Sequence, residues 1–299
     1  MTEKQPPHRA RTMDELREKQ MAAFSAKPPV EFKPYEPRPT DVIITPFGKS
    51  GTTWTQQIFH TLRTAGDMDF TDISEVVPWI ETSPMLGIDL NAEQKANPRG
   101  YKSHLGYDDI PKGARYIVPV RDPRDAFYSS YKFMEGWFME PGAIPIDEFA
   151  RTAYLREQRY WKHLASWWPH RHDDNVLMMT YEYMQAHKTD VIRRIAGFAD
   201  IALNDELLAL TLEHSSLEFM LKYKDRFDDK LMRDLSERNA NLPPGSDSAK
   251  VRAGIIGEHI NLVSQEILDE MDVIWKAVIE PISGCRNYAE LDQALTEGR

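Results

Sequence analysis

The fold is decided by one stretch near the N-terminus, Asp41-Val42-Ile43-Ile44-Thr45-Pro46-Phe47-Gly48-Lys49-Ser50-Gly51-Thr52-Thr53-Trp54. Its first five residues are rich in β-branched side chains and are typical of a strand that is buried on both faces. From Trp54 the apolar residues follow helical spacing as far as Gly66, a typical helix terminator. The stretch therefore predicts a strand, a glycine-containing turn and a helix, in that order.

The turn at residues 47–53 has the chemistry of an anion-binding site. Gly48 and Gly51 let the backbone approach an oxyanion closely, and the N-terminus of the following helix presents unpaired N–H groups. Lys49 adds a full positive charge. Three further side chains offer hydroxyl donors, those of Ser50, Thr52 and Thr53. An ordinary turn with a Ser or Thr cap is the alternative interpretation.

A nucleoside triphosphate matches this turn poorly. The pattern for such ligands is G-x-x-x-x-G-K-[ST], and Gly48-Lys49-Ser50 supplies only its end, because Ile43 occupies the position of the first glycine. The loop is therefore too short to wrap a β-phosphate in that manner, and a single 5′-phosphosulfate fits it better.

Composition restricts the class of protein. The 299 residues are 41% hydrophobic and 28% charged, as in ordinary globular proteins, and the formal net charge of −10 argues against binding to nucleic acids or anionic membranes. No apolar run approaches the roughly 20 residues of a membrane span, and the polar N-terminus does not resemble a secretory signal. The single cysteine, Cys285, fits a reducing compartment, so we expect a cytoplasmic protein.

Strand patterns alternate with helical patterns beyond this first unit. Strands are expected at residues 100–105, 116–120 and 176–181, and helices at 123–136, 146–168, 184–196, 205–214 and 265–279. This alternation predicts an α/β fold in which helices flank a central parallel sheet in three layers. We expect a proline-rich N-terminal arm at 1–40, with a short helix at 13–24, and a single domain at 41–299. The polar segment 222–250 is expected to be a long surface loop.

A second anion site is predicted directly after the strand at 116–120. Arg121 lies at the edge where α/β folds bind ligands, and a guanidinium can bind a phosphate through two hydrogen bonds. Ser129, eight residues later, lies where its hydroxyl can donate to the same phosphate. A triphosphatase would instead place an Asp at this strand end to hold Mg²⁺. The alternative for Arg121 is a surface ion pair with Asp122 or Asp125.

Four motifs together resemble those of the cytosolic sulfotransferase family. Residues 49–54 match the end of that family's T-Y-P-K-S-G-T-T-W loop, although Pro46-Phe47-Gly48 departs from its beginning. Residues 121–131 resemble R-(N/D)-P-x-D-x-x-x-S-Y, 102–105 resemble K-T-H-L, and 252–257 resemble R-K-G-x-x-G with Ala253 in place of the lysine. The resemblance implies a P-loop-like fold and transfer of a sulfuryl group from 3′-phosphoadenosine 5′-phosphosulfate (PAPS) to a hydroxyl, without a metal ion.

The resemblance also implies roles for individual residues. His104 is implied as the general base, Lys49 and Lys102 act at the transferring group, and Ser129 completes the catalytic set. The residues implied in binding PAPS, or its product adenosine 3′,5′-bisphosphate (PAP), are Lys49, Ser50, Gly51, Thr52, Thr53, Trp54, Arg121, Ser129, Tyr181, Ser215, Leu217, Arg252 and Gly254.

The acceptor pocket is the part of the site that the sequence defines least. Residues 77–81 resemble one wall of the family's pocket, and the candidates for an apolar lining are Trp79, Met85, Phe133, Trp137, Phe138 and Met139. Core packing is the alternative for each. Seven Trp and twelve Phe residues indicate an apolar acceptor, which leaves phenols, sterols, lipids and sugar alcohols undistinguished.

Two other functions stay open at this point. A small-molecule kinase would use the same turn, but it would need Mg²⁺ and an acidic strand end. A non-catalytic nucleotide-binding module would tolerate loss of His104. The family's dimer motif, K-x-x-x-T-V-x-x-x-E, has no clear counterpart after Gly257, so a homo-oligomer is neither indicated nor excluded.

Overall fold

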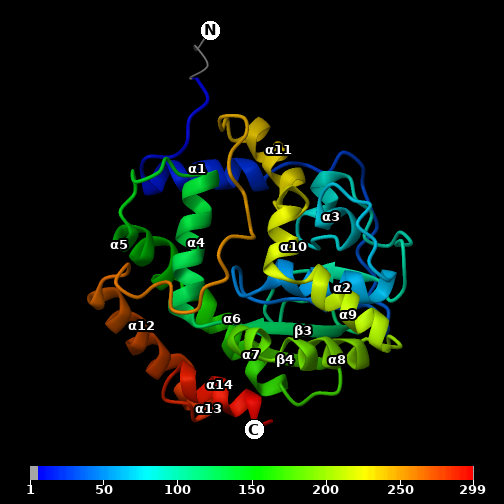
Figure 1. Ribbon diagram of the computed structural model, residues 1–299. Helices are drawn as coiled ribbons and strands as arrows, with labels where there is room; N and C mark the ends of the chain where they lie inside the picture. Colours follow the sequence, from blue (N-terminus) through cyan, green and yellow to red (C-terminus); the bar gives the residue numbers. More distant parts are fainter. Residues whose placement is uncertain (1–5, 299) are drawn as a thin grey trace.

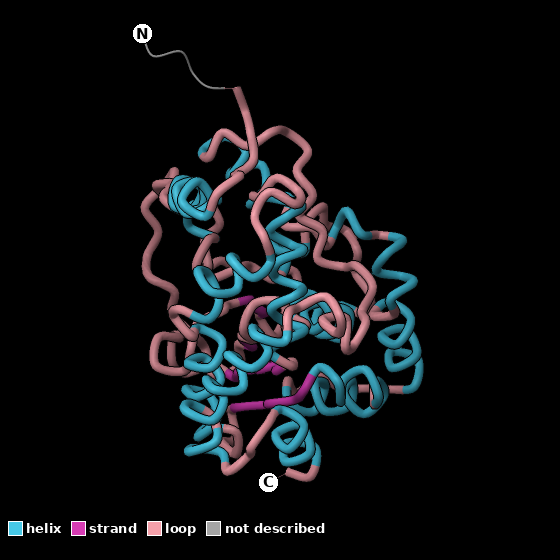
Figure 2. The backbone as a smooth tube through the Cα atoms, turned by 90° about the vertical axis from the view of Figure 1, so that its left-hand side faces the viewer, coloured by secondary structure: helices cyan, strands magenta, loops and turns pink. Residues whose placement is uncertain are grey.

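The structure is a computed structural model that describes residues 6–298. Its centre is a parallel sheet of four strands in the order β2-β1-β3-β4. The strands are β1 (Val42–Ile44), β2 (Gly100–Lys102), β3 (Arg115–Val120) and β4 (Val176–Thr180). They lie inside the molecule and are enclosed by helices (Figure 2). The expected α/β class with a central parallel sheet is confirmed.

Both faces of the sheet are buried. Successive strand residues point to opposite sides of the sheet, and each side packs against its own set of helices. Ile43 and Val118 join one core cluster with α4 (Pro123–Trp137), α6 (Arg159–Trp167) and α12 (Gln265–Val278). Ile44 and Ile117 join a second cluster with α2 (Thr52–Thr64), α8 (Lys188–Phe198) and α9 (Asp205–His214). The result is the three-layer arrangement that the alternation of patterns predicts.

Shorter helices complete the chain, and Figure 1 shows their places. They are α3 (Ile73–Val76), α7 (Tyr181–Ala186), α10 (Leu217–Lys222), α13 (Glu280–Ser283), α14 (Tyr288–Thr296), η1 (Ser83–Leu86), η3 (Trp168–His170) and η4 (Lys224–Arg226). The helix expected at 184–196 is in fact the end of α7 followed by α8. Among residues 6–298, no helix has both the length and the apolar composition needed to cross a bilayer.

Pro119 sits near the end of β3 without breaking a hydrogen bond of the sheet. The N–H of Tyr116 donates to the β4 side, at Asn175 O, whereas that of Arg115 donates to the β1 side, at Asp41 O. By this alternation position 119 faces the β1 side, but β1 ends at Ile44, which pairs with Ile117. The proline therefore stands beyond the last hydrogen bond between β3 and the β1 side, a place in a sheet where proline is tolerated.

The single helix expected at 146–168 is wrong. The segment forms α5 (Ile146–Phe149), a π-helical stretch η2 (Ala150–Leu155), and then α6, separated by Gln158 in the left-handed region at φ 54°. Tertiary packing explains the break, because it brings both Tyr154 and Tyr160 against Phe47, with ring centroids 6.0 and 5.5 Å apart. The interruption thus supports the turn that follows β1.

The long surface loop expected at 222–250 is also wrong, because it contains α11 (Lys230–Asn239). Met232 and Leu235 are buried, and α11 lies beside α1 (Met13–Phe24) at the top of Figure 1. Leu16 is buried on the α1 side, and the Lys19 ammonium donates to Ala240 O at 3.0 Å. The α1 part of the N-terminal arm is therefore packed onto the domain.

Gly100 in β2 allows a test of the packing between the sheet and α2. A Cβ added there would lie 2.3 Å from Cε1 of Phe59, which is fully buried. We expect Gly100→Ala to lower the free energy of unfolding by about 1–3 kcal/mol, as overpacking does, in equilibrium urea unfolding. The control is Gly197→Ala in α8, where a Cβ meets nothing within 4 Å and alanine favours the helix. Equal stability of the two variants would contradict the packing described.

Candidate active site

The turn after β1 has the backbone geometry of an anion-binding loop. Lys49 and Gly51 both have positive φ, at 68° and 95°, and Gly51 is the N-cap of α2 without a side chain to cap it. A Cβ at Gly51 would lie 3.0 Å from Cδ2 of Tyr181. Glycine is therefore required for two reasons, conformation and space. Thr52 and Thr53, in the first turn of α2, are largely buried behind it.

Lys49 carries its charge into a partly enclosed space. Its ammonium lies 4.0 Å from the ring centroid of Phe133 in α4. Burial, and then the nearby charge of Lys250, lower the pKa of Lys49 to about 7. Ser50 is fully buried, and its Oγ finds no hydrogen-bond partner within residues 6–298.

A cluster of charges surrounds the end of β2. Lys102 is only 2% exposed, and its ammonium lies 3.8 Å from the Trp79 ring centroid and 3.7 Å from Oδ1 of Asp229. The same Oδ1 accepts a hydrogen bond from the Lys250 ammonium, and the two groups form an ion pair. Burial lowers the pKa of Lys102 to about 7, although Asp229 opposes the shift. We call Lys49, Lys102, Lys250 and Asp229 the lysine cluster.

Two members of the lysine cluster were missed by sequence reasoning. Asp229 and Lys250 lie in the polar segment expected to be a surface loop, where a charged residue carries no sign of burial. An antiparallel bridge between Asp228 and Ala249 brings their two segments together. No local sequence pattern predicts a contact between two residues this far apart in the chain.

His104 follows β2 directly and is held in one tautomer. Its Nδ1 lies 2.7 Å from the carbonyl oxygen of Pro46 and donates to it, and its backbone N–H donates to Oε1 of Glu81 at 2.8 Å. Its ring meets Trp79 edge-on at 5.4 Å. Burial, and then the charge of Lys102, lower the pKa of His104 to about 3. The imidazole is therefore neutral, with the lone pair on Nε2.

Arg121, at the end of β3, is buried rather than part of a surface ion pair. It is 7% exposed, and its Nη atoms donate to Ile255 O at 2.9 Å and to Lys49 O at 3.4 Å. The guanidinium stacks over Tyr181 at 4.6 Å, and Asp125 lies 3.7 Å away. Its Nε has no hydrogen-bond partner among the described residues. Arg121 thus joins the turn after β1 to the loop at 252–257.

The 252–257 loop is fastened to α4 by one carboxylate. Asp125 accepts from the N–H of Gly257 at 2.7 Å and from His259 Nδ1 at 2.6 Å. Arg252 forms a two-pronged ion pair with Glu258 and stays exposed. Of the residues expected at a 3′-phosphate, Arg121 is therefore enclosed and Arg252 is at the surface. Ser129, in the second turn of α4, is partly buried.

The residues expected around a nucleoside meet from four segments. Trp54 donates through Nε1 to Ser215 O at 2.9 Å and packs edge-on against Tyr181 at 5.7 Å. Gly254 lies between Tyr181 and Leu217, since a Cβ there would be 3.7 and 3.8 Å from them. The structure therefore brings these five residues together.

The six acceptor candidates fall into two groups. Trp79, Met85 and Phe133 are partly buried, and the first and last cover Lys102 and Lys49 respectively. The other three are at most 2% exposed core residues under the N-terminal segment, where Met139 pairs with Ala10; they are Trp137, Phe138 and Met139. Core packing, the alternative interpretation, describes this second group.

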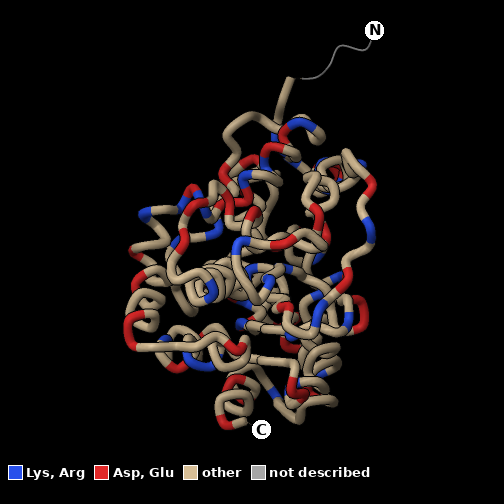
Figure 3. Tube along the Cα trace, turned by 90° about the vertical axis from the view of Figure 1, so that its right-hand side faces the viewer, with Lys and Arg blue, Asp and Glu red and all other residues tan. Residues whose placement is uncertain are grey.

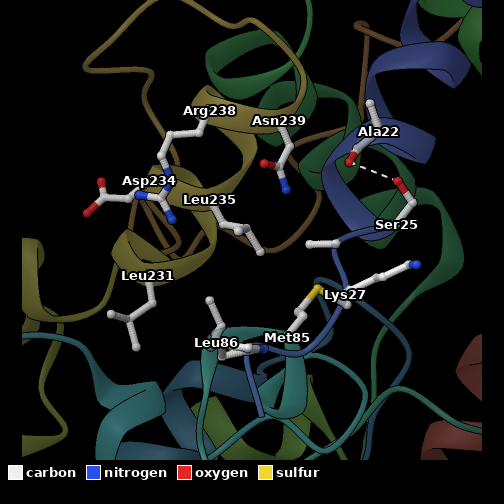
Figure 4. Close-up of a pocket in the computed structure, with 12 residues that line it drawn as sticks. Ala22, Ser25, Lys27, Met85, Leu86, Leu231, Asp234, Leu235, Arg238 and Asn239 are labelled. Atoms are coloured by element: carbon white, nitrogen blue, oxygen red, sulfur yellow. Dashed lines mark hydrogen bonds between the residues drawn. The ribbon is translucent and has the colours of Figure 1, made fainter. Parts of the chain in front are cut away.

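A cavity of about 780 Å³ opens between α1, η1 and α11, and Met85 lines it (Figure 4). Leu86, Leu231 and Leu235 give it an apolar part, whereas Lys27 and Arg238 lie among its polar lining. Phe24, at the end of α1, packs edge-on against Trp79 at 6.3 Å. Trp79 in turn meets the His104 ring edge-on at 5.4 Å, so two ring contacts lead from the end of α1 to the catalytic candidates.

Comparison with known proteins identifies the class. The family model described as "Sulfotransferase domain" matches residues 39–286, so the chain belongs to the sulfotransferase family and is an enzyme of that class. It is 28% identical over 260 residues to Sulfotransferase 1B1 of Canis lupus familiaris, covering 81% of this chain and 84% of the relative. Luciferin sulfotransferase of Photinus pyralis is 27% identical over 284 residues, covering 81% of this chain and 72% of the relative.

Solved structures support the fold. Retinol dehydratase in complex with androsterone and the inactive cofactor PAP aligns with a TM-score of 0.68 at 19% identity, covering 91% of this chain and 96% of that chain. Mouse sulfotransferase SULT7A1 complexed with PAP aligns with a TM-score of 0.62 at 18% identity, covering 95% and 94%. The expected P-loop-like sulfotransferase fold is confirmed.

The electrostatics of the lysine cluster are directly testable. Asp229 raises the pKa of Lys102 against the effect of burial, so Asp229→Asn should move the pKa of Lys102 below its value of about 7. Nitrogen NMR of the lysine Nζ, followed against pH, measures this. Asp14→Asn is the control, because Asp14 is exposed and forms a surface ion pair with Arg17. A Lys102 midpoint that is the same in all three proteins would contradict the cluster.

Proposed function

We propose that this sulfotransferase moves the sulfuryl group of PAPS to a hydroxyl of a small apolar acceptor. The observation that carries the proposal is the convergence of two cationic sites and one neutral histidine at the carboxyl edge of the sheet. Lys49 and Lys102 lie on one side and Arg121 on the other, and His104 keeps an available lone pair on Nε2. Two separate cationic sites suit a donor with separate 5′ and 3′ anionic groups.

The chemistry of each subsite supports one arrangement of the donor. The 5′-phosphosulfate belongs at the N-terminus of α2, where Ser50, Gly51, Thr52 and Thr53 surround the helix start. The 3′-phosphate belongs at Arg121 and Ser129, and the adenine lies near Trp54 and Tyr181. Arg252 can close over the 3′-phosphate by exchanging Glu258 for the ligand, since both are charge-assisted partners.

In the transfer step the acceptor oxygen attacks sulfur as its proton passes to Nε2 of His104. The new O–S bond forms while the bond from sulfur to the bridging phosphate oxygen breaks. The electron pair stays on the departing 5′-phosphate, which Lys49 and Lys102 stabilise as positive charges. All of the positive charge that this step needs comes from side chains of the chain itself.

The pKa of His104 fits this role once the donor is bound. Burial and Lys102 hold it at about 3 in the free protein. A donor anion beside Lys102 offsets the repulsion between that ammonium and an imidazolium, and so raises the pKa of His104 toward neutrality. The base is therefore activated by its own cosubstrate.

The cavity between α1, η1 and α11 is the proposed entrance for the acceptor. Its apolar part, which includes Met85 and Leu235, suits a phenol, sterol or other apolar alcohol. Trp79 and Phe133 then form the inner walls over the two lysines. We also propose a cytoplasmic location, from the resemblance to the cytosolic members and the single buried cysteine.

The base is tested by substitution. His104→Gln should lower the transfer rate from PAPS by about 10²–10⁴-fold, the usual contribution of general-base catalysis, and should leave the affinity for PAP nearly unchanged. The assay follows transfer of a radiolabelled sulfuryl group to a panel of phenols and sterols. His172→Gln, at an exposed position, is the matched control. Wild-type turnover in His104→Gln would remove His104 from the mechanism.

A further inference from the structure

Lys250 is a buried cation for which the sequence motifs provide no role. The motif at 252–257 follows Lys250 and has Ala253 where the family pattern has a lysine. Its loop therefore has one positive charge fewer than the pattern. Lys250 lies three residues earlier, and its side chain is 8% exposed. It points away from the exposed pair of Arg252 and Glu258 and into the lysine cluster.

The position of Lys250 is fixed by Asp229. The bridge between Asp228 and Ala249 sets the two backbones side by side, and Oδ1 of Asp229 pairs with Lys250 while lying 3.7 Å from Lys102. One carboxylate oxygen therefore holds two ammonium groups on the same side of the site. A lysine held in this way keeps donors on its ammonium for a further acceptor, because the group has three.

Lys250 also acts electrostatically on Lys49 in the turn after β1. Of the charged neighbours that act on Lys49, Lys250 has the largest effect on its pKa, which it lowers. The ammonium groups of Lys102 and Lys250 lie at Oδ1 of Asp229, and the charge of Lys49 interacts with both Lys250 and Asp229. A buried charge is stabilised by a nearby charge of the opposite sign. An anion bound between Lys49 and Lys250 would supply that opposite charge.

We infer that Lys250, positioned by Asp229, is a further cation of the phosphosulfate site and binds the 5′ end of the donor. This assignment rests on the proposed function. The ligand atoms are the oxygens of the 5′-phosphate and of the sulfuryl group. The competing explanation is that Lys250 only neutralises the buried carboxylate of Asp229.

Calorimetry with PAP, adenosine 3′-phosphate and adenosine 5′-phosphate separates the two explanations. Lys250→Met should weaken binding of PAP and of the 5′-phosphate by about 10- to 100-fold, the effect of losing a hydrogen bond to a charged group. Binding of the 3′-phosphate should change by less than about twofold, since a cation at the 5′ end makes no contact with it. Lys250→Arg should restore most of the affinity. Arg121→Ala is the mirror-image variant, which should weaken binding of the 3′-phosphate and spare the 5′-phosphate.

Each other outcome overturns a defined claim. Equal weakening of all three nucleotides in Lys250→Met, or no weakening, would reduce Lys250 to the ion-pair partner of Asp229. Lys250→Gln, with a melting temperature measured beside it, repeats the test if the methionine variant does not fold. Failure of the wild-type protein to bind PAP would overturn the proposed function itself. Normal wild-type binding with an unaffected Lys250→Met overturns only the assignment of Lys250.

Discussion

The register of three parallel strands brings together the turn after β1, His104 and Arg121. Ile44 of β1 pairs with Lys102 of β2 on one side and with Ile117 of β3 on the other. Because parallel strands end at a common edge, the turn after β1, His104 after β2 and Arg121 after β3 are delivered to one place. A slip of one residue would turn Lys102 to the opposite face. The core clusters on both faces of the sheet hold that register.

This arrangement concentrates positive charge in a protein whose net charge is −10. Acidic and basic residues are interspersed along most of the chain (Figure 3), so the cationic character is local to the sheet edge. Burial lowers the pKa of Lys49 and of Lys102 to about 7. The charged form of both lysines is therefore less favourable in the free site than in water. In the proposed mechanism, an anionic donor stabilises the charged lysines and also raises the pKa of His104, which couples donor binding to activation of the base.

Local signals in the sequence predicted the parts of the site that depend on local structure. The turn at 47–53 and the helix that begins at Pro123 each follow from a few neighbouring residues, and both lie where expected. Features created by packing between distant segments were not predictable. Examples are the burial of α11 against α1 and the break before α6. Asp229 with Lys250 belongs to the same group, since neither residue has a neighbour in sequence that signals the pair.

The central claim is that the site takes a nucleotide with separate 3′ and 5′ anionic groups rather than a triphosphate. Calorimetry with PAP and with ATP plus Mg²⁺, under the same conditions, tests it most directly. The geometry of Arg121 and Lys49 predicts that PAP binds at least about tenfold more tightly, because only PAP makes a charged contact at both sites. Tighter binding of ATP with Mg²⁺ would contradict the account and indicate a kinase.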